Sequence, residues 1–193
     1  HNFPNHSAVK VELNPVGSEP GEPLFTEDYI AVPSTGSGTI IKTDFMNGVS
    51  WVLTAAHVCL AGKDSFLINI HSENQDAIDD VEWNVNILSW EGEKYFGEVI
   101  KHDNFLDACI VKVDGIPGPS IKLSQRAPEI GQRVYGVHAP LGFAEPEMMP
   151  LFEGFYSGMH HLGMVYTVPV IAGSSGGSIV NDRNQILGIV VFG

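Results

Sequence analysis

The chain has 193 residues, of which 44% are hydrophobic and 17% are charged. This composition is typical of a folded globular protein, and no apolar stretch approaches the ~18 residues that span a bilayer, so no membrane insertion is expected. Ten Lys and Arg against 23 Asp and Glu give a formal net charge of −13, which would repel a phosphate backbone. We therefore expect one domain over residues 1–193, with no nucleic-acid partner.

The first part of the chain carries short β-branched runs separated by Gly, Pro and Asn, which predicts an all-β fold. A first strand is expected at Ala8–Leu13, before a loop rich in Pro, Gly and acidic residues that runs to about Ser34. A turn at Asn47-Gly48 predicts a hairpin between Gly38–Ile41 and Ser50–Leu53. Further strands are expected at Phe66–Ile70, Asn84–Leu88, Glu98–Ile100 and Cys109–Val113.

The segment Gly115–Pro119 interrupts this pattern and predicts a linker over residues 115–120. It separates an N-terminal barrel, residues 8–114, from a C-terminal barrel, residues 121–193. Strands of the second half are expected at Gly131–Val137, Leu151–Tyr156, Met164–Val168 and Ile186–Phe192.

Three short strings hold candidate catalytic residues in the chain order His…Asp…Ser. They are Thr54-Ala55-Ala56-His57, the apolar run that begins at Asp107, and Gly173-Ser174-Ser175-Gly176-Gly177. A serine hydroxyl is a poor nucleophile, so it needs an imidazole to take its proton and a carboxylate to orient that imidazole. We predict His57 as the base, Asp107 as the orienting carboxylate and Ser175 as the nucleophile, in a cleft between the two halves.

The glycine-rich string around Ser175 also fits the G-x-S-x-G nucleophile elbow of α/β-hydrolases. That class needs a histidine after the serine, and none follows Gly176. The subtilisin order, Asp…His…Ser, would have to use Asp28 or Asp44, and neither begins an apolar strand. A phosphate-binding loop would need a lysine after the glycines, where Ser178 stands instead.

Other residues of the same types compete for each role. Asp103 and Asp114 flank the run that Asp107 begins, and Ser174 precedes Ser175. Only Ser175 has a glycine both two residues before it and two after it. The glycines allow a sharp turn in which the N–H groups of Gly173 and Ser175 converge on a developing oxyanion, which predicts the oxyanion hole.

The two cysteines follow the candidate residues closely: Cys59 is two residues after His57, and Cys109 is two after Asp107. If the triad assembles, both a disulfide and a pair of buried thiols are consistent with this spacing. There is no C-x-x-C pair, so no structural zinc is expected, and we predict no metal and no other cofactor.

These strings resemble the chymotrypsin-fold (trypsin-like) serine endopeptidases, and within them most closely the HtrA/Deg branch. The resemblance rests on Gly36–Ile41, Val52–Val58, Asp107–Val113 and Val134–Gly142, together with the serine loop Gly173–Val180 and Ile186–Ile189. It implies two antiparallel β-barrels with the triad between them. It also implies protein or peptide substrates and a location outside the cytoplasm, secreted or periplasmic, with a viral or host-cell origin as the alternative.

The chain departs from that family in three places. Ser174 stands where trypsin-like zymogens carry Asp and HtrA proteins usually carry Asn, so activation through a freed N-terminus is not expected. We expect no PDZ domain after the protease-like region. The chain ends at Gly193, where the resemblance places a wall of the substrate pocket. Either the chain is a trimmed fragment or the second barrel lacks its last strand.

The resemblance also places the primary substrate pocket, whose residues are uncharged. They are Pro169, Val170, Val191, Phe192 and Gly193. An apolar residue before the scissile bond is therefore expected. Two alternatives stay open: a viral protease that processes a polyprotein, and an inactive protease-like binding module. The sequence does not determine the oligomeric state.

Overall fold

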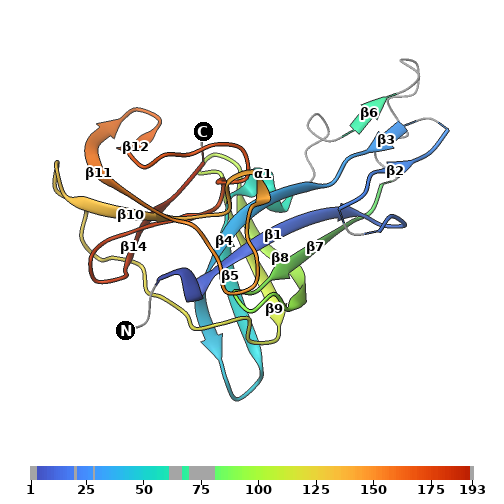
Figure 1. The fold of residues 1–193 in the computed structure, drawn as a ribbon, viewed down its shortest axis with the longest axis horizontal. Helices are drawn as coiled ribbons and strands as arrows, with labels where there is room; N and C mark the ends of the chain where they lie inside the picture. The colour runs from blue at the N-terminus through green and yellow to red at the C-terminus, as the bar shows by residue number, and fades with distance from the viewer. Residues whose placement is uncertain (1–3, 20, 28, 61–66, 70–80, 192–193) are drawn as a thin grey trace.

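The computed structural model describes residues 4–19, 21–27, 29–60, 67–69 and 81–191. It is almost entirely β-structure, and most of the strands form two curved sheets (Figure 1). The first is a closed antiparallel barrel with the strand order β1-β4-β5-β9-β8-β7. The barrel strands are β1 (Ala8–Pro15), β4 (Ser34–Asp44), β5 (Val49–Thr54), β7 (Trp83–Leu88), β8 (Lys94–Asp103) and β9 (Ala108–Asp114).

The interior of this barrel is filled by β-branched side chains from alternate strand positions. Buried and less buried residues alternate strictly along β5 and along most of β9. The fully buried core includes Val9, Ile40, Val52 and Val111. Because successive side chains of a strand point to opposite faces, this alternation places one face of each strand in the core. The disulfide half-cystines Cys59 and Cys109 belong to the same cluster.

The second sheet has five strands in the order β12-β11-β10-β13-β14. They are β10 (Arg133–Val137), β11 (Leu151–His160), β12 (Gly163–Tyr166), β13 (Ser178–Val180) and β14 (Ile186–Ile189). Two apolar clusters pack on this sheet, one around Val137 and Val180 and one around Val134 and Ile179. The predicted double-barrel class is confirmed, although in the described residues the second unit is a curved sheet and not a closed barrel.

Short elements complete the chain. A small sheet joins β2 (Leu24–Phe25), β3 (Tyr29–Ala31) and β6 (Leu67–Asn69) at one end of the molecule (Figure 1). In the described residues the helical segments are the 3-10 turns η1 (Pro4–Ser7) and η3 (Pro140–Gly142) and the single-turn helix α1 (Ala56–Cys59). Among the described helices, none has the length and apolar character needed to cross a membrane.

The predicted strands agree with the observed ones in position more closely than in length. The hairpin at Asn47-Gly48 is present, where Gly48 has φ +62°, but β4 begins earlier and ends later than expected. Two short strands, β2 and β3, interrupt the predicted N-terminal loop. Strand β13, which directly follows the serine loop, was not predicted. Parts of the predicted strands Phe66–Ile70 and Ile186–Phe192 lie outside the described residues.

Candidate active site

His57 lies on α1, immediately after the barrel strand β5. Its ring Nδ1 is 2.6 Å from Asp107 Oδ2, and its backbone N–H donates to Asp107 Oδ1 at 2.9 Å. Asp107 stands in the turn between β8 and β9, where its φ of +49° is unusual for a residue with a side chain. Its own carbonyl accepts a hydrogen bond from Ala56 N–H at 3.1 Å. One carboxylate therefore holds both the backbone and the ring of His57.

The competing carboxylates have other partners. Asp103 Oδ1 accepts the N–H groups of Phe105 and Leu106, at 2.9 and 3.0 Å, and so closes the β8–β9 turn. Asp114, at the far end of β9, is highly exposed and lies 3.6 Å from the Lys112 ammonium. Of the three aspartates, Asp107 is the one that contacts the His57 ring.

A disulfide bond joins Cys59 to Cys109. It connects the helix that carries His57 to the strand that follows Asp107, and both half-cystines are buried. Of the two outcomes that the sequence left open, the structure contains the disulfide. It crosslinks the two segments that carry the imidazole and the carboxylate.

Ser175 lies in the glycine-rich loop before β13, and this loop packs against the first barrel. The Ser175 carbonyl accepts a hydrogen bond from Ser37 N–H at 2.7 Å. A Cβ on Gly176 would overlap the Ser37 carbonyl and the Thr54 hydroxyl, so the loop reaches the end of β5 just before His57. Among the described residues, no hydrogen bond joins the Ser175 hydroxyl to the His57 ring. In ligand-free enzymes such contacts often tighten only when substrate binds.

Ser174, the alternative nucleophile, is fully buried. Its hydroxyl accepts a hydrogen bond from Ile171 N–H at 3.1 Å, and its own N–H donates to the Ile171 carbonyl at 2.9 Å. Ser175, in contrast, is partly exposed. The buried serine therefore closes the loop from inside, and the partly exposed one is left to face a ligand.

The backbone of the serine loop presents two free donors. The N–H groups of Ser174, Gly176 and Gly177 all donate to backbone carbonyls. Those of Gly173 and Ser175 donate to no protein group among the described residues. Buried or half-buried N–H groups are normally paired, so a neighbouring pair without protein acceptors is an arrangement suited to an oxyanion.

Two contacts orient these donors. The Ala172 carbonyl accepts from Leu141 N–H at 2.6 Å, and the Ser174 carbonyl accepts from Gly177 N–H at 3.0 Å. In a trans peptide the C=O and the following N–H point in opposite directions, so each contact sets the direction of one donor. Leu141 reaches its partner from a turn in which it has a left-handed φ of +53°.

Ser37 is the site residue whose role sequence reasoning missed. Its hydroxyl donates to the Gly173 carbonyl at 2.8 Å and accepts from Ala139 N–H at 2.8 Å. With its backbone bond to Ser175, this buried serine connects β4 of the first barrel to the serine loop of the second sheet. The local sequence, a serine between Gly36 and Gly38, carries no signal specific to this role.

His138 is the other unexpected residue near the loop. Its ring is fully buried, stacks on Phe152 with centroids 4.5 Å apart, and has no hydrogen-bond partner of good geometry among the described residues. Burial lowers the pKa of His138 to about 4, against a smaller opposing effect of the Pro169 backbone. The ring is therefore neutral in the folded protein at neutral pH. A Cβ on Gly177 would overlap the His138 Cβ, so the base of this side chain lies against the serine loop, while its ring lies beside Gly136.

We predict that His138 makes the domain sensitive to acid. Because the folded-state pKa of His138 is below its ordinary value, the unfolded chain takes up the proton first as the pH falls from about 6.5 towards 4. This group should then remove about 3 kcal/mol from the free energy of unfolding between pH 7 and pH 4. Chemical denaturation across this range should show that His138→Leu, which cannot titrate, lacks this component. Identical pH dependence in the two proteins would contradict the assignment.

The residues that the resemblance assigned to the primary pocket lie partly within the described chain. Pro169 is exposed, while Val170 is half-buried against the cluster that includes Val134 and Ile179. Val191 is half-buried, and Phe192 and Gly193 lie outside the described residues. The pocket role of all five stays a prediction.

Comparisons with known proteins agree with this fold. A family model of the trypsin-like peptidase domain matches residues 36–189. The serine endoprotease from Yersinia pestis is similar in structure, with a TM-score of 0.66 and 21% identity, covering 97% of this chain and 54% of that one. An inactive form of the Rv3671c protease has a TM-score of 0.63 and 18% identity, covering 97% of this chain and 77% of that one. No curated protein sequence matches the chain.

Chymotrypsin-fold proteases have this architecture: a closed antiparallel barrel stands beside a second curved sheet. A histidine, an aspartate and a serine flanked by glycines lie where the two meet. The chain belongs to the trypsin-like peptidase domain family. The resemblance to chymotrypsin-fold, trypsin-like peptidases that the sequence indicated is thereby confirmed, and the closer resemblance to the HtrA/Deg branch stays a prediction. The chain spans about half the length of the Yersinia pestis structure that it matches.

Proposed function

We propose that this domain is a serine endopeptidase that cleaves protein or peptide substrates through an acyl-enzyme on Ser175. The observation that carries the proposal is the double contact of Asp107 with His57, which fixes the imidazole beside the serine loop. A carboxylate on Nδ1 keeps the proton there and leaves Nε2 as the basic nitrogen. The free N–H groups of Gly173 and Ser175 support the same proposal.

In the first half-reaction, Ser175 Oγ attacks the scissile carbonyl carbon while His57 Nε2 takes the hydroxyl proton. The carbonyl oxygen becomes an oxyanion, which accepts hydrogen bonds from Gly173 and Ser175 N–H. The tetrahedral intermediate then collapses, the C–N bond breaks, and His57 gives its proton to the leaving amine. Asp107 stays ionised and stabilises the transient imidazolium.

In the second half-reaction, water takes the place of the leaving amine. His57 removes a proton from the water as its oxygen attacks the ester carbonyl of the acyl-enzyme. The second tetrahedral intermediate collapses, and the ester bond to Ser175 Oγ breaks. His57 returns the proton to Ser175, and a carboxylic acid leaves. No residue needs a metal or a cofactor for these steps.

For the residue before the scissile bond we propose an apolar side chain. The support is the uncharged character of Pro169, Val170 and Val191, together with the sequence assignment of Phe192 and Gly193. A pocket selective for Lys or Arg would be expected to carry a carboxylate, and none of these residues supplies one. A peptide library profiled by mass spectrometry should show cleavage mainly after apolar residues. Cleavage mainly after basic residues would exclude this preference.

The test of the catalytic assignment is covalent labelling with a fluorophosphonate, which reacts only with an activated serine. We expect the parent protein to be labelled, Ser174→Ala to keep labelling, and Ser175→Ala to lose it. Ser174→Ala is the matched control because Ser174 is buried with its hydroxyl already hydrogen-bonded. Labelling retained in Ser175→Ala would refute the choice of nucleophile. A parent protein that stays unlabelled would favour an inactive, protease-like binding module.

A further inference from the structure

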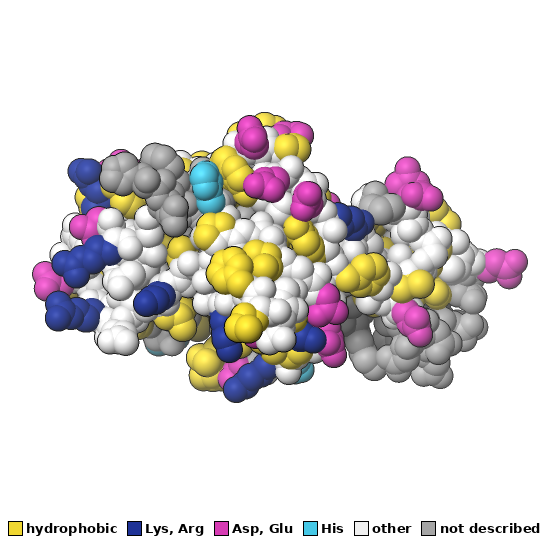
Figure 2. All heavy atoms as spheres, turned by 90° about the horizontal axis from the view of Figure 1, so that it is seen from below, with side chains coloured by type: hydrophobic (Ala, Val, Ile, Leu, Met, Phe, Trp, Pro, Cys, Tyr) yellow, Lys and Arg dark blue, Asp and Glu magenta, His cyan; other side chains and the backbone are white. Residues whose placement is uncertain are grey.

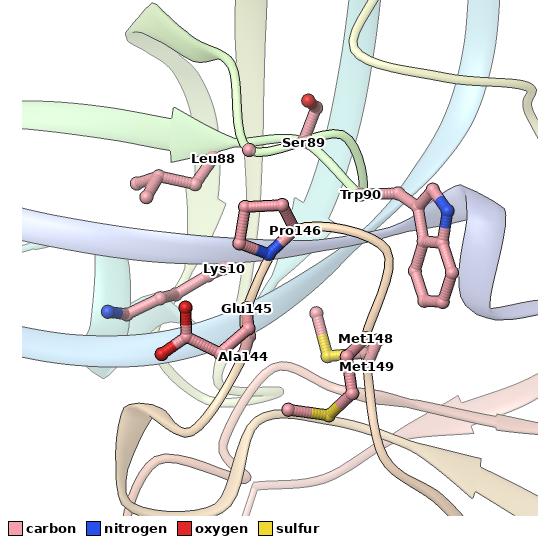
Figure 3. Close-up of a pocket in the computed structure, with 10 residues that line it drawn as sticks. Lys10, Leu88, Ser89, Trp90, Ala144, Glu145, Pro146, Met148 and Met149 are labelled. Atoms are coloured by element: carbon pink, nitrogen blue, oxygen red, sulfur yellow. The ribbon is translucent and has the colours of Figure 1, made fainter.

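A cavity outside the catalytic residues opens between strand β1, the turn that joins β7 to β8, and the loop of residues 143–150 (Figure 3). Its volume is about 160 Å³. Most of its wall is apolar, and the apolar lining residues include Leu88, Trp90, Ala144, Pro146, Met148 and Met149. Apolar cavities of roughly 150 Å³ accommodate a molecule the size of benzene. This cavity is therefore large enough for one Leu, Met or Phe side chain.

The cavity wall is continuous with the oxyanion loop. Lys10, a lining residue, is the register partner of Ser37 in the β1–β4 pair, and Ser37 bonds to Gly173 and Ser175. A Cβ on Gly142 would lie 3.4 Å from Lys10 Cε, and one on Gly173 would lie 2.7 Å from Gly142 N. The cavity thus lies on the far side of Gly142 from Gly173. Val170 of the predicted pocket packs instead with the second sheet.

The two loops that form the cavity are joined to each other and carry carboxylates. Glu147 N–H donates to the Trp90 carbonyl at 2.7 Å, which ties the 143–150 loop to the β7–β8 turn. Glu145 lines the cavity, Glu91 and Glu147 adjoin lining residues in sequence, and all three are exposed. The Lys10 ammonium, the one cation of the lining, is already paired with Glu12 at 3.0 Å. The rim of the cavity is therefore net negative.

The wider surface has the same bias. On the face in Figure 2, Lys and Arg lie on the left, the side of β10 and β11 in Figure 1, and along the lower middle, while carboxylates predominate over the upper middle and the right. A ligand for an apolar cavity with a negative rim needs an apolar side chain and a neighbouring positive charge. A peptide segment in which Lys or Arg adjoins Leu, Met or Phe has both features.

We propose that this cavity is an exosite that binds such a basic and apolar segment of the substrate, on the leaving-group side of the scissile bond. The proposal rests on the proposed function, because the leaving-group side is defined relative to the proposed primary pocket, which binds the residue before the scissile bond. The apolar side chain fills the space beside Trp90 and Met149. The adjacent cation lies near Glu145 and Glu147, and the peptide passes Gly142 to reach Ser175.

The test compares two quenched fluorescent peptides that are identical up to the scissile bond. After that bond, one carries Leu-Arg pairs and the other carries Ser at the same positions. The kcat/KM of each peptide is divided by that of a reference peptide amide, which has no residue after the scissile bond. Changes in the chemical step then cancel. For the parent protein we expect kcat/KM to favour the Leu-Arg peptide by about tenfold or more, the scale of burying one apolar side chain.

Two variants separate the parts of the proposed site. Ala144→Phe fills the cavity and should reduce the preference to near one. The double variant Glu145→Gln and Glu147→Gln leaves the cavity open and should reduce the preference roughly threefold, as expected for exposed charges. Glu129→Gln is the matched control, since Glu129 is exposed next to β10 and outside the lining. It should leave the preference unchanged. An equal preference in the parent protein and Ala144→Phe would overturn the exosite.

Binding to Ser175→Ala distinguishes failure of the exosite from failure of the proposed function. Fluorescence anisotropy with the labelled Leu-Arg peptide reports binding without any cleavage. If the parent protein is not labelled by fluorophosphonate, yet this peptide binds and Ala144→Phe abolishes binding, the site stands and the catalytic proposal falls. If labelling succeeds but the Leu-Arg and Ser peptides bind and react equally, the catalytic proposal stands and the exosite falls.

Discussion

Asp107→Asn is expected to lower kcat about 10⁴-fold with little change in the fold, the size of effect known for this substitution in triad enzymes. The reason lies in the two bonds that Asp107 makes. If the Asn oxygen keeps the bond to His57 N–H, its NH₂ group faces Nδ1 of the ring. The ring must then accept at Nδ1 and carry its proton on Nε2. In that tautomer His57 cannot take the proton of Ser175.

The measurement is kcat on a cleavable peptide, with thermal unfolding of the same preparations. Asp103→Asn is the matched control, because Asp103 lies in the same turn and uses Oδ1 to accept two N–H groups, which an Asn oxygen also does. It should retain kcat within a few-fold. A loss in Asp103→Asn equal to that in Asp107→Asn would mean that the turn, and not the carboxylate beside His57, controls activity.

The fold was largely predictable because its signals are local. Alternation along β5 and β9 and the Asn47-Gly48 turn mark the barrel strands, since one face of each strand must be apolar. Strand ends were less predictable because pairing partners determine them. Thr35 and Asp44 belong to β4 since Glu12 and Val49 lie opposite them in register. Strand β13 was missed since its residues, Ser178–Val180, read as the end of a glycine loop.

The contact between His57 and Asp107 was also predictable, because triad chemistry restricts residue type and chain order, while the catalytic roles themselves stay predictions. The residues that surround and position the candidate catalytic residues could not be predicted from the sequence. Ser37 and Leu141 act through backbone groups of residues far away in sequence, such as Gly173 and Ala172. A contact of that kind leaves no trace in local spacing. Likewise, His138 differs from other histidines only through its burial against Phe152, which depends on how the second sheet packs.

Gly173→Ala is expected to lower kcat about 10²–10³-fold, the effect of losing one oxyanion donor. Gly173 has φ +89°, and a Cβ there would lie 2.7–2.8 Å from the Ala139 carbonyl and the backbone nitrogens of Leu141 and Gly142. Those atoms belong to the turn that holds the Ala172 carbonyl. Because they are backbone atoms, they cannot move aside by a change of rotamer. The turn must shift, and the Gly173 N–H loses its direction.

Gly131→Ala separates this effect from simple backbone strain. Gly131 has a similar φ of +83°, but a Cβ there would meet nothing within 4 Å. It should cost about 1–2 kcal/mol of stability through its left-handed conformation and leave kcat unchanged. Gly173→Ala should have the same stability cost. In addition its kcat should fall while KM changes less, because the hydrogen bond to the oxyanion forms only as the carbonyl becomes tetrahedral. Equal kcat values for the two variants would show that the Leu141 turn does not orient the donor. Fluorophosphonate labelling of both gives an independent check, because the phosphoryl oxygen uses the same two N–H groups as the oxyanion.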